Sequence, residues 1–264
     1  MRIIFIGDIV GRPGREATKK IIPKLKKEFE PHIIIANGEN ISGGKGLTSD
    51  HLDEMHRAGI DFFTSGNHIW HNRDLFPRMD EKDTLVLRPA NFPSNNPGRG
   101  WRIVETALMK RILVINLHGR IFIHNDYECP FLTVDKILKE TAHEYLDGIF
   151  VDIHAEATSE KVAMGQYLDG RVSAVFGTHT HIPTADLRIL TGGTAYLTDA
   201  GMVGLKESII GVDKENIIKN FLTQMPVKHE ISSHGLVTFC AAYVDIDSER
   251  KATEVKQILR EIEV

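Results

Sequence analysis

Short apolar runs recur along the chain, and segments with the periodicity of amphipathic helices separate many of them. The runs are rich in β-branched and aromatic residues, which indicates buried strands. They include Ile3–Ile6, His32–Ala36, Asp61–Thr64, Leu85–Leu87, Ile112–Leu117, Ile149–Ile153 and Val172–Phe176. Helical periodicity is found in Arg15–Phe29, Thr48–Ala58, Val134–Glu144 and Thr158–Leu168. This alternation favours an α/β fold with largely parallel strand pairing.

Some of the helix ends can be predicted as well. We expect Thr48 or Ser49 to cap the second helix, and Thr158 or Ser159 to cap the fourth, because their side-chain oxygens can accept from free backbone N–H groups. Pro23 should kink or split the first helix, since proline cannot donate the backbone hydrogen bond that a helix interior requires.

The C-terminal third of the chain has a different pattern. Leu236–Ile246 and Ala252–Ile262 flank a polar turn at Asp247–Arg250, which predicts an antiparallel hairpin. Such a hairpin implies a mixed sheet, or a second sheet packed on the first. The loop Pro89–Gly100 contains three prolines and forms a long turn rather than a linker. We find no repeat and no low-complexity segment, and we predict one domain over residues 1–264.

Composition limits the partners and the compartment. The chain has 264 residues and a formal net charge of -4, so no overall basic field attracts nucleic acid, although a local basic groove is not excluded. Its two cysteines, Cys129 and Cys240, lack metal or redox spacing and are expected to be reduced buried thiols. The apolar run near the N-terminus is too short for a signal peptide, and none is long enough for a membrane span. We therefore expect a cytoplasmic protein.

Side chains that can bind metals follow one predicted strand after another. These residues are Asp8, Glu39 with Asn40, Asn67 with His68, His118, His154 with Glu156, and His179 with His181. Ligand sites of α/β sheets lie outside the carboxyl ends of the strands, so these side chains should converge. One such residue alone would more often cap a helix or a turn. The whole set, which offers oxygen and imidazole nitrogen but no thiolate, suits manganese, iron or zinc.

The ordered set resembles the calcineurin-like metallophosphoesterases. The matching elements are Gly7-Asp8, Gly38-Glu39-Asn40, Gly66-Asn67-His68, His154 and Gly177-Thr178-His179-Thr180-His181. Each element is weak alone, whereas the set in the family's order is highly specific. The elements run from Gly7 to His181 and therefore cover most of the predicted strands.

Three departures narrow the resemblance. Val10 stands where the wider superfamily carries the histidine of an Asp-x-His element, and Asn40 would offset that loss. The second carboxylate is Glu39 rather than aspartate, and Ile69 replaces the acidic residue that commonly follows Gly-Asn-His. These features are similar to the YmdB-like subfamily, which shares the GDIVGRPGR opening, the NGEN segment and the SGNHIW stretch. The similarity then extends over nearly the whole chain.

The resemblance implies a fold, a reaction and a cofactor. The fold would be a four-layer α/β/β/α sandwich of mixed sheets. The activity would be a phosphodiesterase that acts on small cyclic nucleotides such as 2',3'- or 3',5'-cyclic AMP. Two divalent or trivalent metal ions are implied, with iron or manganese favoured. Stable binding to nucleic acid or to a membrane is not expected, and a homo-oligomer is left open.

The resemblance also assigns roles to residues. One metal would be held by Asp8, Glu39, Asn40 and His181, and the other by Glu39, Asn67, His154 and His179. Such ions lie roughly 3.5–4 Å apart, and a hydroxide between them would attack phosphorus. His68 would protonate the leaving oxygen as a general acid. A side chain at Gly177 would crowd the ions.

Alternatives to this function stay open at the level of the sequence. The same metals would serve a phosphomonoesterase or 5'-nucleotidase, or a metal-stabilised regulatory protein with little turnover. His68 argues against the last, since metal binding alone does not require it. The turn Gly43–Gly46 fails the G-x-x-x-x-G-K-[ST] pattern and is not expected to be a phosphate loop. Whether Arg12, Lys45, His71 or His118 contacts substrate is undecided.

Overall fold

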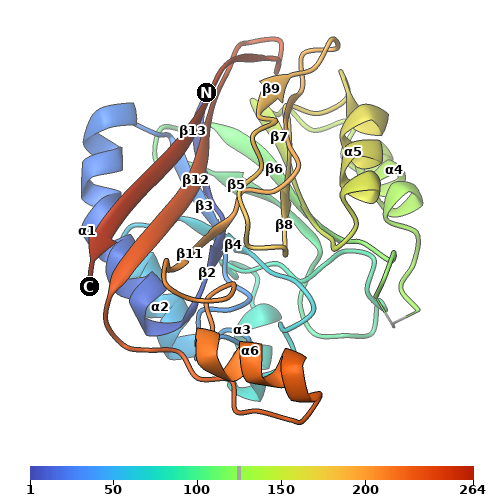
Figure 1. Cartoon of the computed structure of the whole chain (residues 1–264). Coiled ribbons are helices and arrows are strands. Elements are labelled where there is room, and N and C mark those ends of the chain that lie inside the picture. The colour runs from blue at the N-terminus through green and yellow to red at the C-terminus, as the bar shows by residue number, and fades with distance from the viewer. Residues whose placement is uncertain (124–125) are drawn as a thin grey trace.

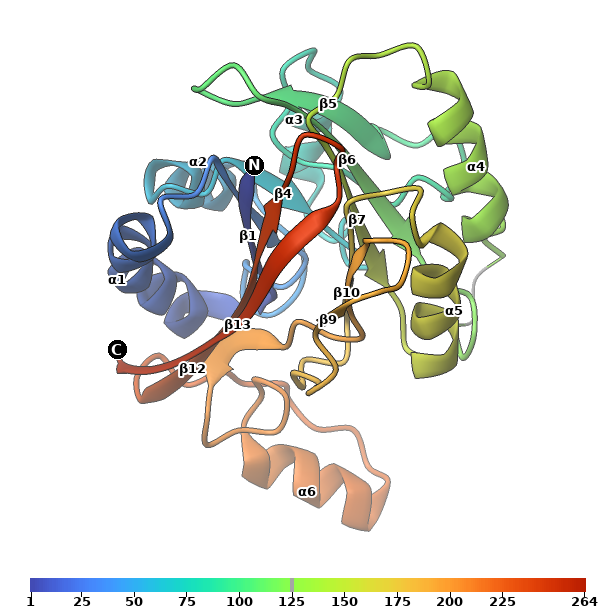
Figure 2. The ribbon, with the colours of Figure 1, turned by 90° about the horizontal axis from the view of Figure 1, so that it is seen from above.

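Two β-sheets pack face to face, and helices cover the outer face of each sheet (Figures 1 and 2). The structure is a computed structural model that describes residues 1–123 and 126–264. Figure 2 looks along the layers and shows a layer of helices, then the two sheets, then a second layer of helices. The predicted four-layer α/β/β/α sandwich is therefore confirmed.

The first sheet is mixed and has the strand order β2-β11-β12-β1-β3-β4, with β13 paired to β12. Its strands are β1 (Arg2–Ile6), β2 (Asp8–Ile9), β3 (Ile33–Asn37), β4 (Phe62–Thr64), β11 (Met202–Leu205), β12 (Leu236–Ile246) and β13 (Ala252–Glu263). β1, β3 and β4 are parallel, whereas β12 runs antiparallel to β1, β11 and β13. The predicted C-terminal hairpin is confirmed as β12 and β13, and it explains why the sheet is mixed.

The second sheet has the order β5-β6-β7-β8-β10-β9. Its strands are β5 (Trp101–Glu105), β6 (Arg111–His118), β7 (Gly148–His154), β8 (Ala174–Thr178), β9 (Arg188–Ile189) and β10 (Ala195–Leu197). The four inner strands are parallel, and the outer strands β5 and β9 are antiparallel to their neighbours. The predicted strand Leu85–Leu87 is wrong, because within the described residues Val86 makes only an isolated bridge to Phe63.

The helices lie where the periodicity predicts them, but several of their ends differ from the predicted ends. They are α1 (Gly11–Phe29), α2 (Ser49–Arg57), α3 (Phe76–Met79), α4 (Pro130–Glu140), α5 (Thr158–Leu168) and α6 (Lys214–Thr223), with a 3-10 turn at Arg73–Leu75. Pro23 does not split α1. It faces solvent, where water can bind the carbonyl that loses its helical partner. α4 begins four residues before its predicted start because Pro130 occupies the first helical turn, where proline is favoured.

One of the two predicted helix caps is confirmed. Thr48 is the N-cap of α2, and its side chain accepts a hydrogen bond from the backbone N–H of His51. The cap predicted for α5 is wrong. Ala157 occupies the N-cap, neither Thr158 nor Ser159 does, and no side chain makes a cap hydrogen bond there. A cap depends on the backbone angles of one residue, which a sequence pattern places only to within a residue or two.

Three apolar clusters hold the layers together. One joins α1 and α2 to the first sheet, one fills the space between the sheets, and one joins α4 and α5 to the second sheet. Phe5 of β1 packs on Phe150 of β7 with ring centroids 4.9 Å apart, across the contact between the sheets. No described helix is long and apolar enough to cross a membrane. The sheet-to-sheet cluster matters most for function, because it aligns the strand ends of both sheets.

Candidate metal centre

The carboxyl ends of parallel strands from both sheets meet at one place, which we call the ligand edge. Asp8 comes after β1, and Glu39 and Asn40 come after β3. His154 is the last residue of β7, and His179 follows β8. Strands β6, β7 and β8 pair in register, so that His118 lies beside His154 and His154 beside Thr178. Parallel pairing therefore gathers residues that are far apart in the sequence.

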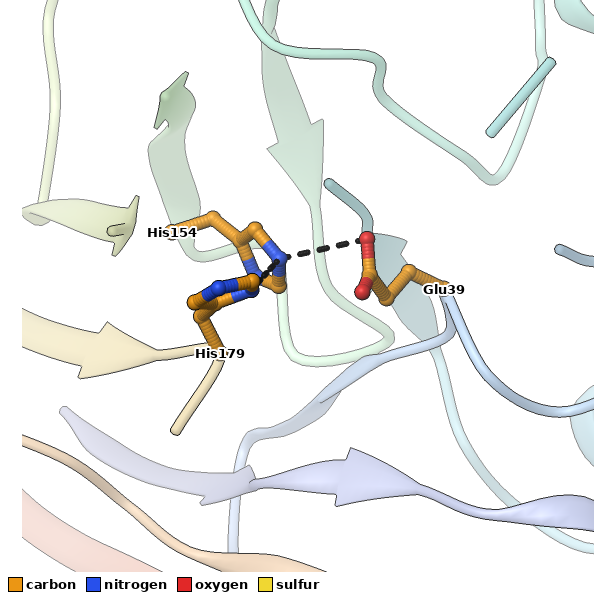
Figure 3. A group of neighbouring side chains, drawn as sticks. All are labelled: Glu39, His154 and His179. Carbon is orange, nitrogen blue, oxygen red and sulfur yellow. Dashed lines mark hydrogen bonds and ion pairs between the residues drawn. The ribbon is translucent and has the colours of Figure 1, made fainter. Parts of the chain in front are cut away.

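Glu39, His154 and His179 form the centre of this edge (Figure 3). One ligand atom from each lies within 4.8 Å of the others. His154 Nε2 is 3.2 Å from Glu39 Oε2 and 3.1 Å from His179 Nδ1. Glu39 and His154 are buried, and the side chain of His179 is 24% exposed. A carboxylate and two ring nitrogens that face one point in this way fit a metal ion.

A second group of donors lies beside the first. His181 Nε2 is 3.0 Å from Asn40 Nδ2 and 3.9 Å from Asp8 Oδ1. The other oxygen of Asp8, Oδ2, accepts from the backbone N–H of His179 at 3.1 Å. Asp8 is fully buried, and its Oδ1 is one of the buried side-chain atoms without a hydrogen-bond partner in the described part of the chain. A buried carboxylate oxygen without a partner is costly, and a cation would compensate it.

His68 connects the two groups. Its Nδ1 is 3.2 Å from Glu39 Oε1 and 3.0 Å from Asn40 Oδ1, and its backbone N–H donates to Glu39 Oε2. About a third of its side chain is exposed, in contrast to the buried glutamate. Glu39 thus contacts the His154 ring through Oε2 and the His68 ring through Oε1. The predicted bridging carboxylate and the predicted general acid are neighbours in space.

Asn67 lies beside His118 rather than in contact with the central group. Its Oδ1 is 3.4 Å from His118 Nε2, and His118 Nδ1 hydrogen bonds to the Gly119 carbonyl oxygen at 2.7 Å. His118 is fully buried, with its ring 5.5 Å from that of His154. The prediction that Asn67 is a ligand is therefore untested by these contacts. Because Nδ1 must donate to the Gly119 carbonyl, the neutral ring of His118 can orient the Asn67 amide only by accepting at Nε2 from its NH2 group, with the amide turned so that Oδ1 faces away.

Partners outside the two groups of donors fix which ring nitrogen of each ligating histidine faces the site. The hydroxyl of Thr178 donates to Asp152 Oδ1 at 2.7 Å, so His154 Nδ1 must donate to that hydroxyl at 2.9 Å. The Nε2 lone pair of His154 is then free to bind a metal. His181 Nδ1 donates to the Ile210 carbonyl oxygen at 2.8 Å, and Glu156 lies 3.1 Å from the Nε2 of His179. Such partners hold a ring in its ligating orientation.

Asp152 is a site residue that sequence reasoning missed. It is fully buried and accepts hydrogen bonds from Thr64, Thr178 and Asn37, which come from three different strands. Burial raises its pKa to about 7 against the effect of those hydrogen bonds. A charged residue inside an apolar strand, two positions before His154 and on the same face, was the signal that could have found it.

The electrostatics of the edge favour a cation. Burial, together with the nearby charges of Glu39 and Asp199, raises the pKa of Asp8 well above its ordinary value. Burial also acts to raise the pKa of Glu39, but His154 and His68 outweigh it and hold that pKa low. Burial lowers the pKa of His154 and of His179 to about 4. Carboxylates that repel one another and neutral imidazoles are a donor set that a metal ion would stabilise.

Gly66 is the glycine that the central group requires. A Cβ at Gly66 would lie 2.2 Å from both Glu39 Oε2 and His154 Nε2. The prediction that a side chain at Gly177 would crowd the ions is wrong, because such a side chain would collide with other protein atoms. A Cβ there would meet the backbone oxygen of Thr198 at 1.9 Å and the stem of Lys161 at 2.9 Å. Gly177 gives space to neighbouring protein atoms, whereas Gly66 gives space to the donors.

The comparisons with known proteins agree with this geometry. A profile of the YmdB-like protein family matches residues 4–258. The chain belongs to this family. A 2',3'-cyclic-nucleotide 2'-phosphodiesterase from Bacillus subtilis (strain 168) is 48% identical over 260 residues, covering 98% of this chain and 97% of the relative.

Two solved structures resemble the fold closely. A hypothetical protein from Thermus thermophilus has a TM-score of 0.91 at 36% identity, and the alignment covers 99% of both chains. A novel phosphatase from Mycoplasma pneumoniae has a TM-score of 0.91 at 33% identity, covering 100% of this chain and 94% of that one. The resemblance to the YmdB-like family therefore extends from the motifs to the whole fold.

In this YmdB-like chain, the departures from the wider superfamily have a local explanation. Val10 is the N-cap of α1, and its side chain packs close to Gly211 and Gly204. Asn40 instead contacts His181 at the position described above. The suggestion that Asn40 offsets the missing histidine is compatible with this arrangement and stays a prediction.

The remaining sequence candidates lie around the edge. The turn that contains Lys45 folds back on the donors, because the N–H groups of Gly44 and Gly46 bond to the carbonyls of Asn40 and Glu39. Arg12 and His71 are exposed. Whether these three side chains contact substrate stays open. His124, which has no partner pattern in the sequence, lies outside the described residues.

Proposed function

We propose that this chain is a dinuclear metal-dependent phosphodiesterase that hydrolyses cyclic nucleotides. The coarser activity, hydrolysis of phosphoric ester bonds, follows from membership of the YmdB-like family and from the 48% identical phosphodiesterase. The number of ions and the choice between 2',3'- and 3',5'-cyclic AMP are the finer parts of the proposal. The cytoplasmic location and the oligomeric state stay predictions.

The position of Glu39 is the observation that carries the proposal. This buried carboxylate lies between His154 and His179 on one side and His68 with Asn40 on the other. Asp8 and His181 complete the second group beside it. Two sets of oxygen and nitrogen donors that share one carboxylate suit two ions, and iron or manganese fits this donor chemistry.

The chain's own residues would bind and orient both the ions and the substrate. Asp8, Asn40 and His181 would hold one ion, while Asn67, His154 and His179 would hold the other, with Glu39 shared. When bound, the ions would supply a water of lowered pKa as nucleophile and would neutralise phosphoryl oxygens. Because Asp152 and Thr178 keep the proton of His154 on Nδ1, the Nε2 atom stays available as a ligand.

His68 would act as the general acid. Its Nδ1 donates to Glu39 and Asn40, so the imidazolium form of His68 would give the proton on the opposite nitrogen, Nε2, to the leaving ribose oxygen and become neutral. The partial exposure of this side chain allows substrate to reach it, in contrast to the buried His154. A cyclic phosphodiester needs this proton because the leaving oxygen would otherwise depart as a ribose alkoxide.

The proposal is tested by metal analysis of the purified protein combined with substrate hydrolysis. The substrates are 2',3'-cyclic AMP, 3',5'-cyclic AMP, a generic aryl phosphodiester and 5'-AMP, assayed before chelation, after chelation and after return of Mn²⁺. We expect hydrolysis of a cyclic nucleotide that chelation abolishes and Mn²⁺ restores, with close to two ions per chain. Faster hydrolysis of 5'-AMP would instead favour a phosphomonoesterase, and metal without turnover would favour a regulatory protein.

A further inference from the structure

The two histidines that follow β8 have an unusual backbone. His179 has a φ of 99° and His181 a φ of 64°, and both values lie in the left-handed region that side chains other than glycine rarely adopt. Thr180 stands between them. Such conformations persist only where surrounding structure holds them, and they concentrate at functional sites. Some other group must therefore hold this His-Thr-His turn.

Asp199 is the group that holds the turn. Its Oδ2 accepts from both the backbone N–H of Thr180 at 3.1 Å and the Thr180 hydroxyl at 2.7 Å. Its Oδ1 accepts from the backbone N–H of Gly201 at 2.8 Å, so the carboxylate itself cannot rotate freely. Asp199 follows β10 and is fully buried. The bonds reach Thr180, the residue of the turn that belongs to neither group of donors.

Lys161 balances the charge of Asp199. Its Nζ donates to Asp199 Oδ2 at 2.6 Å, and both side chains are 0% exposed. Lys161 belongs to α5, and its stem passes the position where Gly177 lacks a side chain. A buried ion pair of this kind gives little net stability, yet loss of one partner leaves an uncompensated charge. Its presence under the ligand edge thus calls for a role other than stability.

We propose that the Lys161–Asp199 ion pair is a positioning device for the two histidines of the metal centre. By holding Thr180 from beneath, it keeps His179 directed to His154 and His181 directed to Asn40 and Asp8. The hydrogen bonds of Asp199 to the turn go to Thr180 and not to either histidine, so the pair positions the histidines through the backbone of the turn. The charges of Asp199 and Lys161 also act on Asp8 and on the two histidines His154 and His179, and Thr180→Val tests the positioning without changing those charges. The inference rests on the proposed metal centre.

The test is the affinity of the protein for Mn²⁺, measured by competition with a fluorescent chelator. Thr180→Val removes the hydroxyl that bonds to Asp199 and should weaken Mn²⁺ binding about tenfold, the lower end of the usual effect of outer partners. Thr180→Ser keeps the hydroxyl and should bind Mn²⁺ as the wild type does. Asp199→Asn removes the charge and should weaken binding more, toward about 100-fold.

Thr194→Val is the matched control. Thr194 is fully buried, whereas Thr180 is partly exposed, and the Thr194 hydroxyl bonds to the Val172 carbonyl oxygen beyond the other end of α5. Its loss should lower the melting temperature without changing the affinity for Mn²⁺. Equal affinities for Thr180→Val and the wild type would overturn the inference alone, as would equal losses in the Thr180→Val and Thr194→Val proteins. A wild type that binds no metal would overturn the proposed function, and this inference with it.

Discussion

The two sheets bring different chemistry to the same edge. The first sheet provides mostly oxygen donors, namely Asp8, Glu39 and the amides of Asn40 and Asn67, with His68 as its one imidazole. The second sheet provides His118, His154, His179 and His181, each at or just beyond the end of a parallel strand. Burial disfavours the charged form of the donors from both sheets. It therefore acts to raise the pKa of a carboxyl group and to lower the pKa of an imidazole.

This difference shows that neither sheet contains a complete site. The central contact joins Glu39 of the first sheet to His154 of the second at 3.2 Å, across the interface filled by the sheet-to-sheet core. Burial raises the pKa of Asp8 on one side and lowers the pKa of His154 on the other. A cation would stabilise both sides together, by neutralising carboxylates and by using imidazole lone pairs.

Glu39→Gln should have the largest effect, because it removes the carboxylate that both groups of donors share. We expect loss of both ions, and since each is worth several kcal/mol, a rate loss above about 10⁴-fold. Metal analysis and cyclic-nucleotide hydrolysis measure the two effects. Glu249→Gln is the control, since Glu249 is exposed and pairs with Lys251 in the turn between β12 and β13. Stoichiometric metal in the Glu39→Gln protein would disprove the shared carboxylate.

His68→Ala tests the one imidazole that the first sheet provides. We expect both ions to remain bound, while hydrolysis of a cyclic nucleotide slows about 10²- to 10⁴-fold through loss of the general acid. The loss should be smaller for an aryl phosphodiester, whose leaving oxygen needs no proton. His143→Ala, a change at an exposed histidine that pairs with Glu144 after α4, should leave both quantities unchanged. Full activity of His68→Ala would exclude the acid role.

The positions of the donors could be predicted from the sequence because they depend on local order. A polar residue directly after a buried parallel strand must lie at the carboxyl edge, whatever the details of the fold. Glu39, His154 and His179 can be found in this way, and the structure brings all three together. The C-terminal hairpin can be found for a similar reason, since its two long strands flank a single polar turn.

The partners of the donors could not be predicted in the same way. Asp152, Lys161 and Asp199 act through residues that lie far away in the sequence, and no local pattern specifies those pairs. The continuity of α1 past Pro23 was missed because the cost of that proline depends on its exposure, which the tertiary fold decides. Local pattern therefore indicates the donors, whereas tertiary packing decides how they are held.

His118→Phe should have an intermediate effect. Phenylalanine can replace the buried ring beside Phe92 and Tyr127, but it lacks the Nε2 atom next to the Asn67 amide. If His118 orients that amide, affinity for metal should fall about tenfold with the fold retained. Chelator competition measures the affinity and circular dichroism checks the fold. Unchanged affinity for metal would show that His118 does not orient the Asn67 amide.

Protonation of the buried histidines of the second sheet should destabilise the metal-free protein at acidic pH. The pKa of His118, His154 and His179 is lowered from 6.5 to about 4, chiefly by burial. The folded state binds fewer protons than the unfolded state, so the stability present above pH 6.5 is lost as pH falls toward 4. The loss for one such imidazole is about 3 kcal/mol. The raised pKa values of the buried Asp8 and Asp152 act in the opposite direction over this range, so the test is a difference between two proteins. In urea unfolding with EDTA, His118→Phe should lose about 3 kcal/mol less than the wild type as pH falls from 6.5 to 4, and parallel profiles would contradict the assignment.

Thr48→Ala and Thr158→Ala compare the outer helices of the two sheets and should have the smallest effects. Thr48 caps α2 through the N–H of His51, so its loss should cost about 1 kcal/mol of unfolding free energy. Thr158 is exposed and makes no cap bond, because Ala157 is the N-cap of α5, and its replacement should change stability much less. Urea unfolding measures both, and neither change should alter hydrolysis. Equal losses of unfolding free energy would mean that Thr158 caps α5 in solution. A loss of activity in Thr48→Ala would mean that α2 positions Glu39 and Asn40.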